Sequence, residues 1–135
     1  MPEVNFVEIV VAAVAAIILG FLWYGPIFGK TWMKLTGVTE AKIKEAKEKG
    51  MTKSYVLMMV GSLIMAYVLA SFIELTGMVG AVGGATTGFW AWLGFAATVQ
   101  SSKVLWGSDS WNLYFLETGY YLVSLLVMGA VMGSM

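Results

Sequence analysis

The sequence predicts an all-α fold, a polytopic membrane protein built as a bundle of four transmembrane helices. Hydrophobic residues make up 59% of the chain and charged residues only 12%, whereas charged residues make up about a quarter of an ordinary soluble domain. The apolar residues also gather into four stretches, each near the ~20 residues that a helix needs to cross a bilayer. We place these spans at about 4–26, 54–76, 84–102 and 112–133, within a single membrane domain, 1–135.

The first span is expected to persist as a helix of the mature protein. Small residues such as Ala12 near an apolar run are typical of a cleaved signal peptide, but a signal peptide also begins with positive charge. Here Glu3 and Glu8 come first, and the earliest lysine is Lys30. We therefore assign 4–26 as a membrane span.

Aromatic residues surround the end of this span. Pro26 disfavours helical geometry at Gly25, so the helix is expected to end or kink there. Tryptophan and tyrosine concentrate at the headgroup level of membranes, which favours an anchoring role over an aromatic ligand pocket. The expected anchors are Trp23, Tyr24 and Trp32 here, and Trp106 and Trp111 at the turn after the third span.

The connection 28–53 is expected to carry a short charged helix on the cytoplasmic side. Thr39 can cap its start, and Gly50 is a usual residue just past a helix end. Within it, Glu40 with Lys44 and Glu45 with Lys49 are spaced four apart in the favourable order. A solvated helix near the headgroups is the favoured interpretation, and a site for anionic lipid or a partner is the alternative.

Lysine placement predicts the orientation in the membrane. Seven of the eight lysines fall in the first connection and the eighth, Lys103, in the third. The middle connection and both termini have none. Under the positive-inside rule, the two lysine-bearing connections face the cytoplasm and both termini lie outside a cell (inner) membrane that the chain crosses several times.

Small residues recur every four positions along the spans, which predicts close helix packing. In lipid, such stripes let helix backbones approach. The third span carries two of them, which permits a homo-oligomer or packing against another membrane protein. The stripes are Ala12, Ala16 and Gly20; Ser62, Ala66 and Ala70; Gly80, Gly84 and Gly88; Thr87, Ala91, Gly94 and Thr98; and Gly129 with Gly133.

Glu8 and Glu74 are two candidate residues of a polar pathway. Each is in register with the small-residue stripe of its own span, so both carboxylates are expected on packed faces near the outer boundary. Two close carboxylates raise each other's proton affinity and could form a proton or cation site. The favoured alternative is that each simply reaches water at the end of its span.

Glu117 forms the sharper candidate with Lys103 and Gln100. It lies about one turn inside the fourth span, at the level where Gln100 and Lys103 leave the third. We expect a Lys103–Glu117 ion pair that bridges the two helices, with Gln100 and Asn112 as hydrogen-bond partners. A structural pair is the favoured role, and a transport or gating site is the alternative, because ionisable residues within membranes often mark function.

The missing residue types exclude several classes of function. The chain has no His, Cys or Arg, so Cys/His zinc sites, haem ligation through imidazole or thiolate, and arginine clamps for phosphate are all ruled out. A net charge of zero offers no general basic surface for nucleic acid. We expect no cofactor, no metal and no enzymatic activity, since no serine stands beside an evident base.

Several blocks of the sequence resemble the domain-of-unknown-function family numbered 1761. The resemblance covers nearly the whole chain and implies a small prokaryotic membrane protein with four spans; it implies no activity. The blocks are Trp23-Tyr24-Gly25-Pro26 with Phe28-Gly29-Lys30-x-Trp32-Met33, then Ala66-Tyr67-Val68-Leu69-Ala70, Gly88-Phe89-Trp90-x-Trp92-Leu93-Gly94-Phe95, and Gly119-Tyr120-Tyr121-Leu122-Val123-Ser124.

Two classes of function remain open. One is a transporter or channel for an ion or small molecule, which four helices would need a homo-oligomer to form. The other is a structural or accessory subunit that packs against itself or another membrane protein. In both, membrane lipids are the immediate partners, and neither class is favoured over the other.

Overall fold

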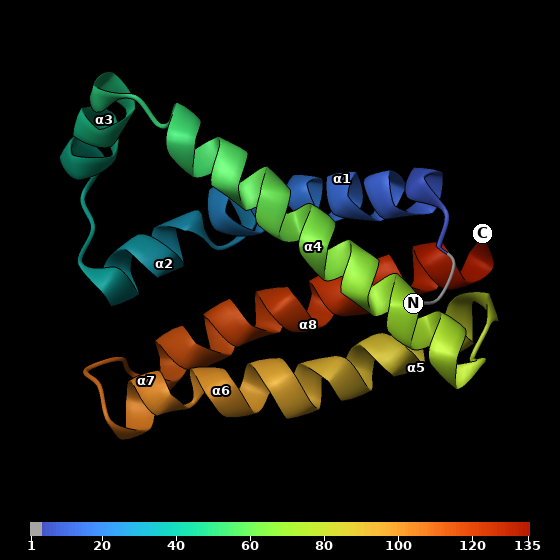
Figure 1. The fold of residues 1–135 in the computed structure, drawn as a ribbon. Coiled ribbons are helices and arrows are strands. Elements are labelled where there is room, and N and C mark those ends of the chain that lie inside the picture. The colour runs from blue at the N-terminus through green and yellow to red at the C-terminus, as the bar shows by residue number, and fades with distance from the viewer. Residues whose placement is uncertain (1–3) are drawn as a thin grey trace.

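In the computed structural model, which describes residues 4–135, the chain forms helices joined by short turns (Figure 1). This confirms the all-α fold over the described residues. In chain order the elements are α1 (Phe6–Leu22), the π-helical turn η1 (Trp23–Ile27), α2 (Gly29–Thr36), α3 (Glu40–Lys49), α4 (Thr52–Thr76), α5 (Gly80–Ala91), the π-helical turn η2 (Trp92–Ala97), α6 (Thr98–Gln100), α7 (Ser102–Leu105) and α8 (Trp111–Ser134).

Three of these helices are long and apolar enough to cross a membrane. They are Phe6–Ile27, Thr52–Thr76 and Trp111–Ser134, which match three of the four expected spans. The expected span 84–102 corresponds to α5, η2 and α6, a rod that is interrupted by a π turn and contains many glycines and threonines. Length and composition therefore support three spans, and the fourth stays a prediction.

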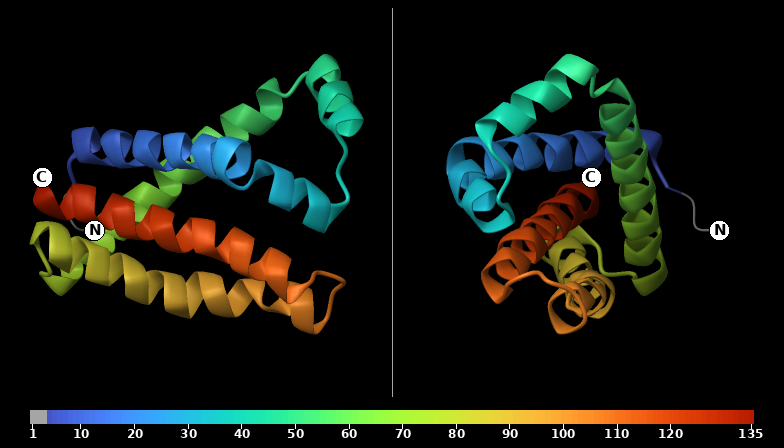
Figure 2. Two further views of the ribbon diagram at one scale, coloured as in Figure 1. Left: turned by 180° about the vertical axis from the view of Figure 1, so that it is seen from behind. Right: turned by 90° about the vertical axis from the view of Figure 1, so that its left-hand side faces the viewer.

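The four long segments run antiparallel in sequence order. The beginning of α1, the turn between α4 and α5, and the end of α8 lie together at one end, here named the closed end (Figure 1). At the other end, the lysine end, lie α2, α3 and the loop after α7. The rod from α5 to α6 lies alongside α8, while α4 crosses the other helices obliquely, as Figure 2 shows from two further sides.

Glycines hold α5 and α8 at backbone contact. A Cβ atom placed on Gly84 would overlap the carbonyl oxygen of Gly129, and one placed on Gly129 would overlap that of Gly84. Gly88 faces the Leu125 carbonyl, and Gly133 faces that of Gly80, in the same way. The glycine stripes that predict close packing are thus the seam of this helix pair, as expected for helices that associate in lipid.

The core occupies the closed end. Ala12 and Ala16 of α1, Ala66 of α4 and Met128 of α8 are all 0% exposed, and other apolar side chains of the same three helices surround them. Toward the lysine end α4 leaves this core, and residues 52–61 are all exposed. The bundle is therefore packed at one end and splayed at the other.

The connection between α1 and α4 contains the charged helix expected there. Thr39 Oγ1 accepts a hydrogen bond from Lys42 N at 3.2 Å, α3 runs over Glu40–Lys49, and Gly50 follows with a positive φ of 93°. Of the two predicted ion pairs, Glu45–Lys49 forms at 3.1 Å between exposed side chains, whereas Glu40–Lys44 does not appear among the ion pairs of the described residues.

The expected kink near Pro26 is present, but the chain beyond it was not expected to be helical. Phe28 N donates to Trp23 O at 2.8 Å, a π-type bond that closes η1 around the proline. At Phe28 the backbone departs from helical geometry, and α2 then begins as a separate helix of eight residues. This short helix turns the chain back against α8 and helps to form the site described next.

Candidate functional site

Two Trp-x-Gly turns contact α8 near its N-terminal end. Trp23 opens η1 and donates from its indole Nε1 to the Leu116 carbonyl at 3.1 Å. Trp92 opens η2 and donates from Nε1 to the Thr118 carbonyl at 2.8 Å and to the Thr118 hydroxyl at 3.1 Å. The two π turns thus place tryptophan donors on carbonyls of a single turn of α8, two residues apart.

Two tyrosines of α8 donate hydrogen bonds in the opposite direction, to η2 and α1. The Tyr120 hydroxyl donates to the Ala16 carbonyl of α1 at 3.0 Å, and the Tyr114 hydroxyl donates to the Ala97 carbonyl of η2 at 2.7 Å. A buried polar group that finds a partner avoids a penalty of about 1–3 kcal/mol. These five bonds therefore fix α8 against both neighbours at the level where Glu117 projects.

The aromatics expected to anchor the first span also contact other parts of the protein, and their anchoring role stays a prediction. Trp23 packs against Phe28 with ring centroids 4.7 Å apart, and Tyr24 stands edge-on to Trp32 at 6.2 Å. All three expected anchors in this region are half-buried. The reason is that η1 and α2 fold back on α8, so the rings cover the helix. The other expected anchors, Trp106 and Trp111, are 89% and 50% exposed.

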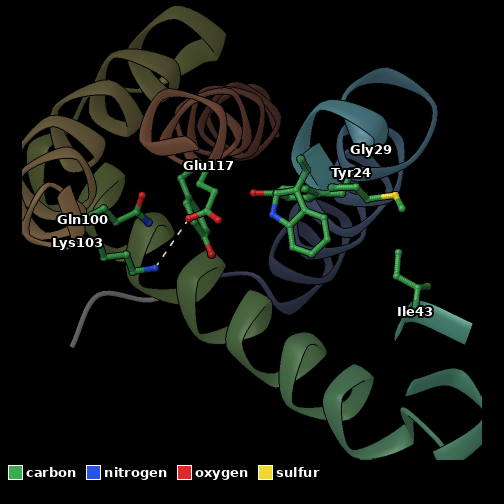
Figure 3. A pocket seen from close by; sticks show the side chains of 9 residues that line it. Tyr24, Gly29, Ile43, Gln100, Lys103 and Glu117 are labelled. Atoms are coloured by element: carbon green, nitrogen blue, oxygen red, sulfur yellow. Dashed lines mark ion pairs between the residues drawn. The ribbon is translucent and has the colours of Figure 1, made fainter. Parts of the chain in front are cut away.

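A cavity of about 470 Å³ opens among η1, α2, α6, α7 and α8 at the lysine end. Figure 3 shows Gln100, Lys103 and Glu117 on one side of it and Tyr24 and Gly29 on the other, with Ile43 of α3 farther out. Trp32, Met33 and Tyr121 complete its lining. One wall therefore carries charged and amide groups, and the opposite wall is mainly aromatic and apolar.

The expected pair of Lys103 and Glu117 lies on the polar wall. Lys103 Nζ and Glu117 Oε2 are 3.9 Å apart, longer than the ~2.7–2.9 Å of a charge-assisted hydrogen bond. The Glu117 side chain is 24% exposed and that of Lys103 is 60% exposed. The carboxylate is thus held in the wall, while the ammonium on the same side of the cavity is largely exposed.

Neither of the two expected hydrogen-bond partners, Gln100 and Asn112, bonds to this pair in the described residues. Gln100 lines the same cavity, but its side chain makes no hydrogen bond to another described residue. Asn112 is exposed and lies on a different face of α8, along a cavity with Trp23 and Phe28. The reason is spacing, since five residues on a helix of 3.6 residues per turn separate the two side chains by about 140°.

Glu8 and Glu74 differ in burial. Glu8 is half-buried and Glu74 is exposed, so a shared proton or cation site of these two carboxylates stays a prediction. The expectation that Glu74 shares the packed face of Ala66 and Ala70 is wrong. A four-residue step overshoots a 3.6-residue turn by about 40°, so the stripe rotates off the core and Ile73 is buried there instead.

A second cavity adjoins the first toward the middle of the bundle. It measures about 550 Å³, shares Tyr24 and Tyr121 with the first cavity, and is also lined by Gly61 and Ser62 of α4. Farther along α8, Ser124 is 0% exposed and its hydroxyl has no hydrogen-bond partner among the described residues. Beyond Ser124 the alanine and methionine core begins, so the hollow part of the bundle ends there.

The described residues hold no cluster of three or more Asp or Glu side chains that could bind a metal ion. Charged chemistry near the cavity is confined to one carboxylate and one ammonium. Sequence reasoning found Gln100, Lys103 and Glu117 but missed the structural role of Trp92. The repeated Trp-x-Gly pattern at Trp23 and Trp92 was the signal that could have revealed it.

The comparison with known families agrees with the blocks noted above. Residues 7–133 match the family described as a protein of unknown function, DUF1761. The chain belongs to this family. No curated protein and no solved structure matches this chain. Since DUF1761 carries no assigned activity, the cavity between η1 and α8 is the feature of this member from which a function can be argued.

Proposed function

We propose that this DUF1761 member is a four-span membrane protein that moves an ion or small molecule, as a homo-oligomer, through the cavity beside Glu117. The observation that carries the proposal is the Glu117 carboxylate, only 24% exposed, in the wall of a cavity of about 470 Å³. The chain around it is 59% hydrophobic, as in membrane proteins. A charge at membrane depth is costly, and where one occurs it usually serves a pathway.

The shape of the bundle supports transport. The cavity is at the lysine end, a second cavity continues it toward the bundle centre, and a dry core of alanine and methionine blocks the closed end. One open and one closed end is the arrangement that alternating access requires. The loosely packed first half of α4 and the two π turns are places where the helices could rearrange to open the other end.

The proposed fourth span and the orientation can be tested with cysteines, because the chain has none of its own. We expect single cysteines at Val79 and Ser108, which flank the segment from α5 to α6, to lie on opposite sides of the membrane. A membrane-impermeant maleimide should label the first in intact cells and the second only after permeabilisation. Labelling of both positions from one side would remove the four-span arrangement.

Transport itself can be tested in proteoliposomes on a solid-supported membrane. Concentration jumps of K⁺, methylammonium, acetate and glycinate should produce a current with at least one of these solutes. Glu117→Gln should abolish that current and leave the thermal unfolding midpoint within about 2 °C of wild type. Wild-type protein that gives no current with any of the four would refute the proposal.

The second candidate, an accessory subunit, has one observation in its favour. The exposed first half of α4 carries a large apolar surface that includes Val56, Leu57, Met59 and Val60. In that case Glu117 and Lys103 would form a structural pair. Glu117→Gln would then lower the unfolding midpoint, and the current would be absent from wild type as well.

A further inference from the structure

We propose that the cavity binds a small organic monocation, and that Lys103 is a tethered competitor that occupies the cation position when no ligand is bound. This inference rests on the proposed function, since it names the ligand class of the same cavity. It follows from the charge, the lining and the size of the cavity.

The charge that is fixed in the cavity is negative. Glu117 projects from the second turn of α8, where hydrogen bonds from Trp23 and Trp92 to Leu116 and Thr118 hold the adjacent backbone in place. Lys103 belongs to α7, a helix of four residues, and its side chain is 60% exposed. A long, exposed lysine can swing into water at low cost, whereas the carboxylate stays in the wall.

The aromatic lining suits a cation with an apolar body. Tyr24 of η1 and Trp32 of α2 line the cavity across from α8, Tyr121 lies one turn along α8 from Glu117, and the faces of aromatic rings attract ammonium groups. Met33 and Ile43 add apolar surface. An anion would meet the carboxylate and these electron-rich rings, with only the exposed Lys103 to attract it.

The size of the cavity points to an organic ion rather than a bare metal ion. About 470 Å³ lies within the ~300–1,000 Å³ range of small-molecule sites. Hard cations such as Ca²⁺ need about six or more oxygen ligands, and this lining offers one carboxylate, one amide and two phenols. A substituted ammonium ion can pair with one carboxylate and bury the rest of its surface on the rings.

The Lys103–Glu117 distance explains the competitor role. At 3.9 Å the ammonium is close enough to offset the carboxylate charge but too far for a good hydrogen bond. The pair is therefore weak enough for an incoming cation to replace Lys103. This makes an unusual prediction, since removal of a charged residue that lines the cavity should strengthen binding.

The test uses three probes of matched shape and different charge. They are benzyltrimethylammonium, its neutral carbon isostere neopentylbenzene, and the anion phenylmethanesulfonate. Binding to the full-length protein in nanodiscs is measured by isothermal titration calorimetry and by tryptophan fluorescence. Wild type should bind the cation with an affinity about tenfold or more above that for the other two probes, the margin expected for one charge-assisted contact.

Variants then assign the roles. Glu117→Gln should weaken cation binding about tenfold or more, while Lys103→Gln should strengthen it several-fold. Trp32→Leu should weaken it, and Trp106→Leu, at a tryptophan that is 89% exposed and outside the cavity lining, should not. Glu74→Gln, at an exposed glutamate outside this cavity, is the matched control for the carboxylate. Unchanged near-UV circular dichroism shows that each variant is folded.

Three results would overturn the inference. They are tighter binding of phenylmethanesulfonate than of the cation, weaker cation binding in Lys103→Gln, or equal cation binding in Glu117→Gln and wild type. The binding test and the transport test can fail independently. Cation binding with this variant pattern but without current would support the ligand class and refute transport. Current carried by another solute, without cation binding, would support transport and refute the ligand class.

Discussion

Gly84→Ala should separate α5 from α8, because the added methyl group would overlap the Gly129 carbonyl oxygen. The two helices must move apart to admit it, and the neighbouring contact between Gly88 and Leu125 loosens with them. Over-packing of this kind typically costs about 1–3 kcal/mol. Alanine recovers about 0.5–1 kcal/mol of this through its better helix propensity, so the net destabilisation should be about 0–2.5 kcal/mol, and about 1–3 kcal/mol relative to a glycine-to-alanine change without a clash.

Gly61→Ala is the matched control. Gly61 lies within α4, and a Cβ atom built there meets nothing within 4 Å, so only the propensity gain should appear. The difference between the two variants isolates the steric cost. It can be measured by reversible unfolding in mixed micelles with increasing SDS, followed by far-UV circular dichroism. If Gly84→Ala is as stable as Gly61→Ala, the backbone contact between α5 and α8 does not exist.

Two further substitutions test the interior of the bundle. Trp92→Phe keeps an aromatic ring but removes the donor to Thr118, and should cost about 1 kcal/mol in the same unfolding assay, whereas Trp90→Phe, at a 61% exposed position, should cost little. Equal effects would contradict the proposed hydrogen bond. Ser124→Ala removes a fully buried hydroxyl without a described partner and should stabilise the fold by about 1 kcal/mol, while Ser71→Ala, whose hydroxyl donates to Tyr67 O at 2.9 Å, should not. A less stable Ser124→Ala would reveal a bond to this hydroxyl.

Features set by neighbouring residues were predictable from the sequence. The cap at Thr39, the end of α3 at Gly50 and the kink near Pro26 depend on contacts within a few positions, and the residue types alone specify them. The glycine seam was predictable for a similar reason, since a stripe of residues without side chains leaves room for close backbone approach.

The candidate site was predictable only in part. Lys103 and Glu117 could be placed at one level because a short turn joins their helices. The aromatic wall could not, because it depends on how η1 and α2 fold back on α8. The Trp23–Leu116 hydrogen bond joins residues 93 positions apart, and no pattern of neighbouring residues predicts which acceptor Trp23 will find. Glu74 was misplaced because a four-residue stripe was followed too far along a helix that turns every 3.6 residues.

The central position of α8 has a consequence for how the protein is made. α1, α4 and the rod that begins with α5 all contact this helix, yet it is the last of the described elements to leave the ribosome. Until then the tryptophan donors of η1 and η2 lack their carbonyl acceptors, and the seam glycines of α5 lack a facing backbone. Before α8 emerges, α1 and α4 can pack on each other but the segment from α5 to α6 lacks most of its contacts, so a nascent chain stalled before residue 111 should be an early substrate for proteases.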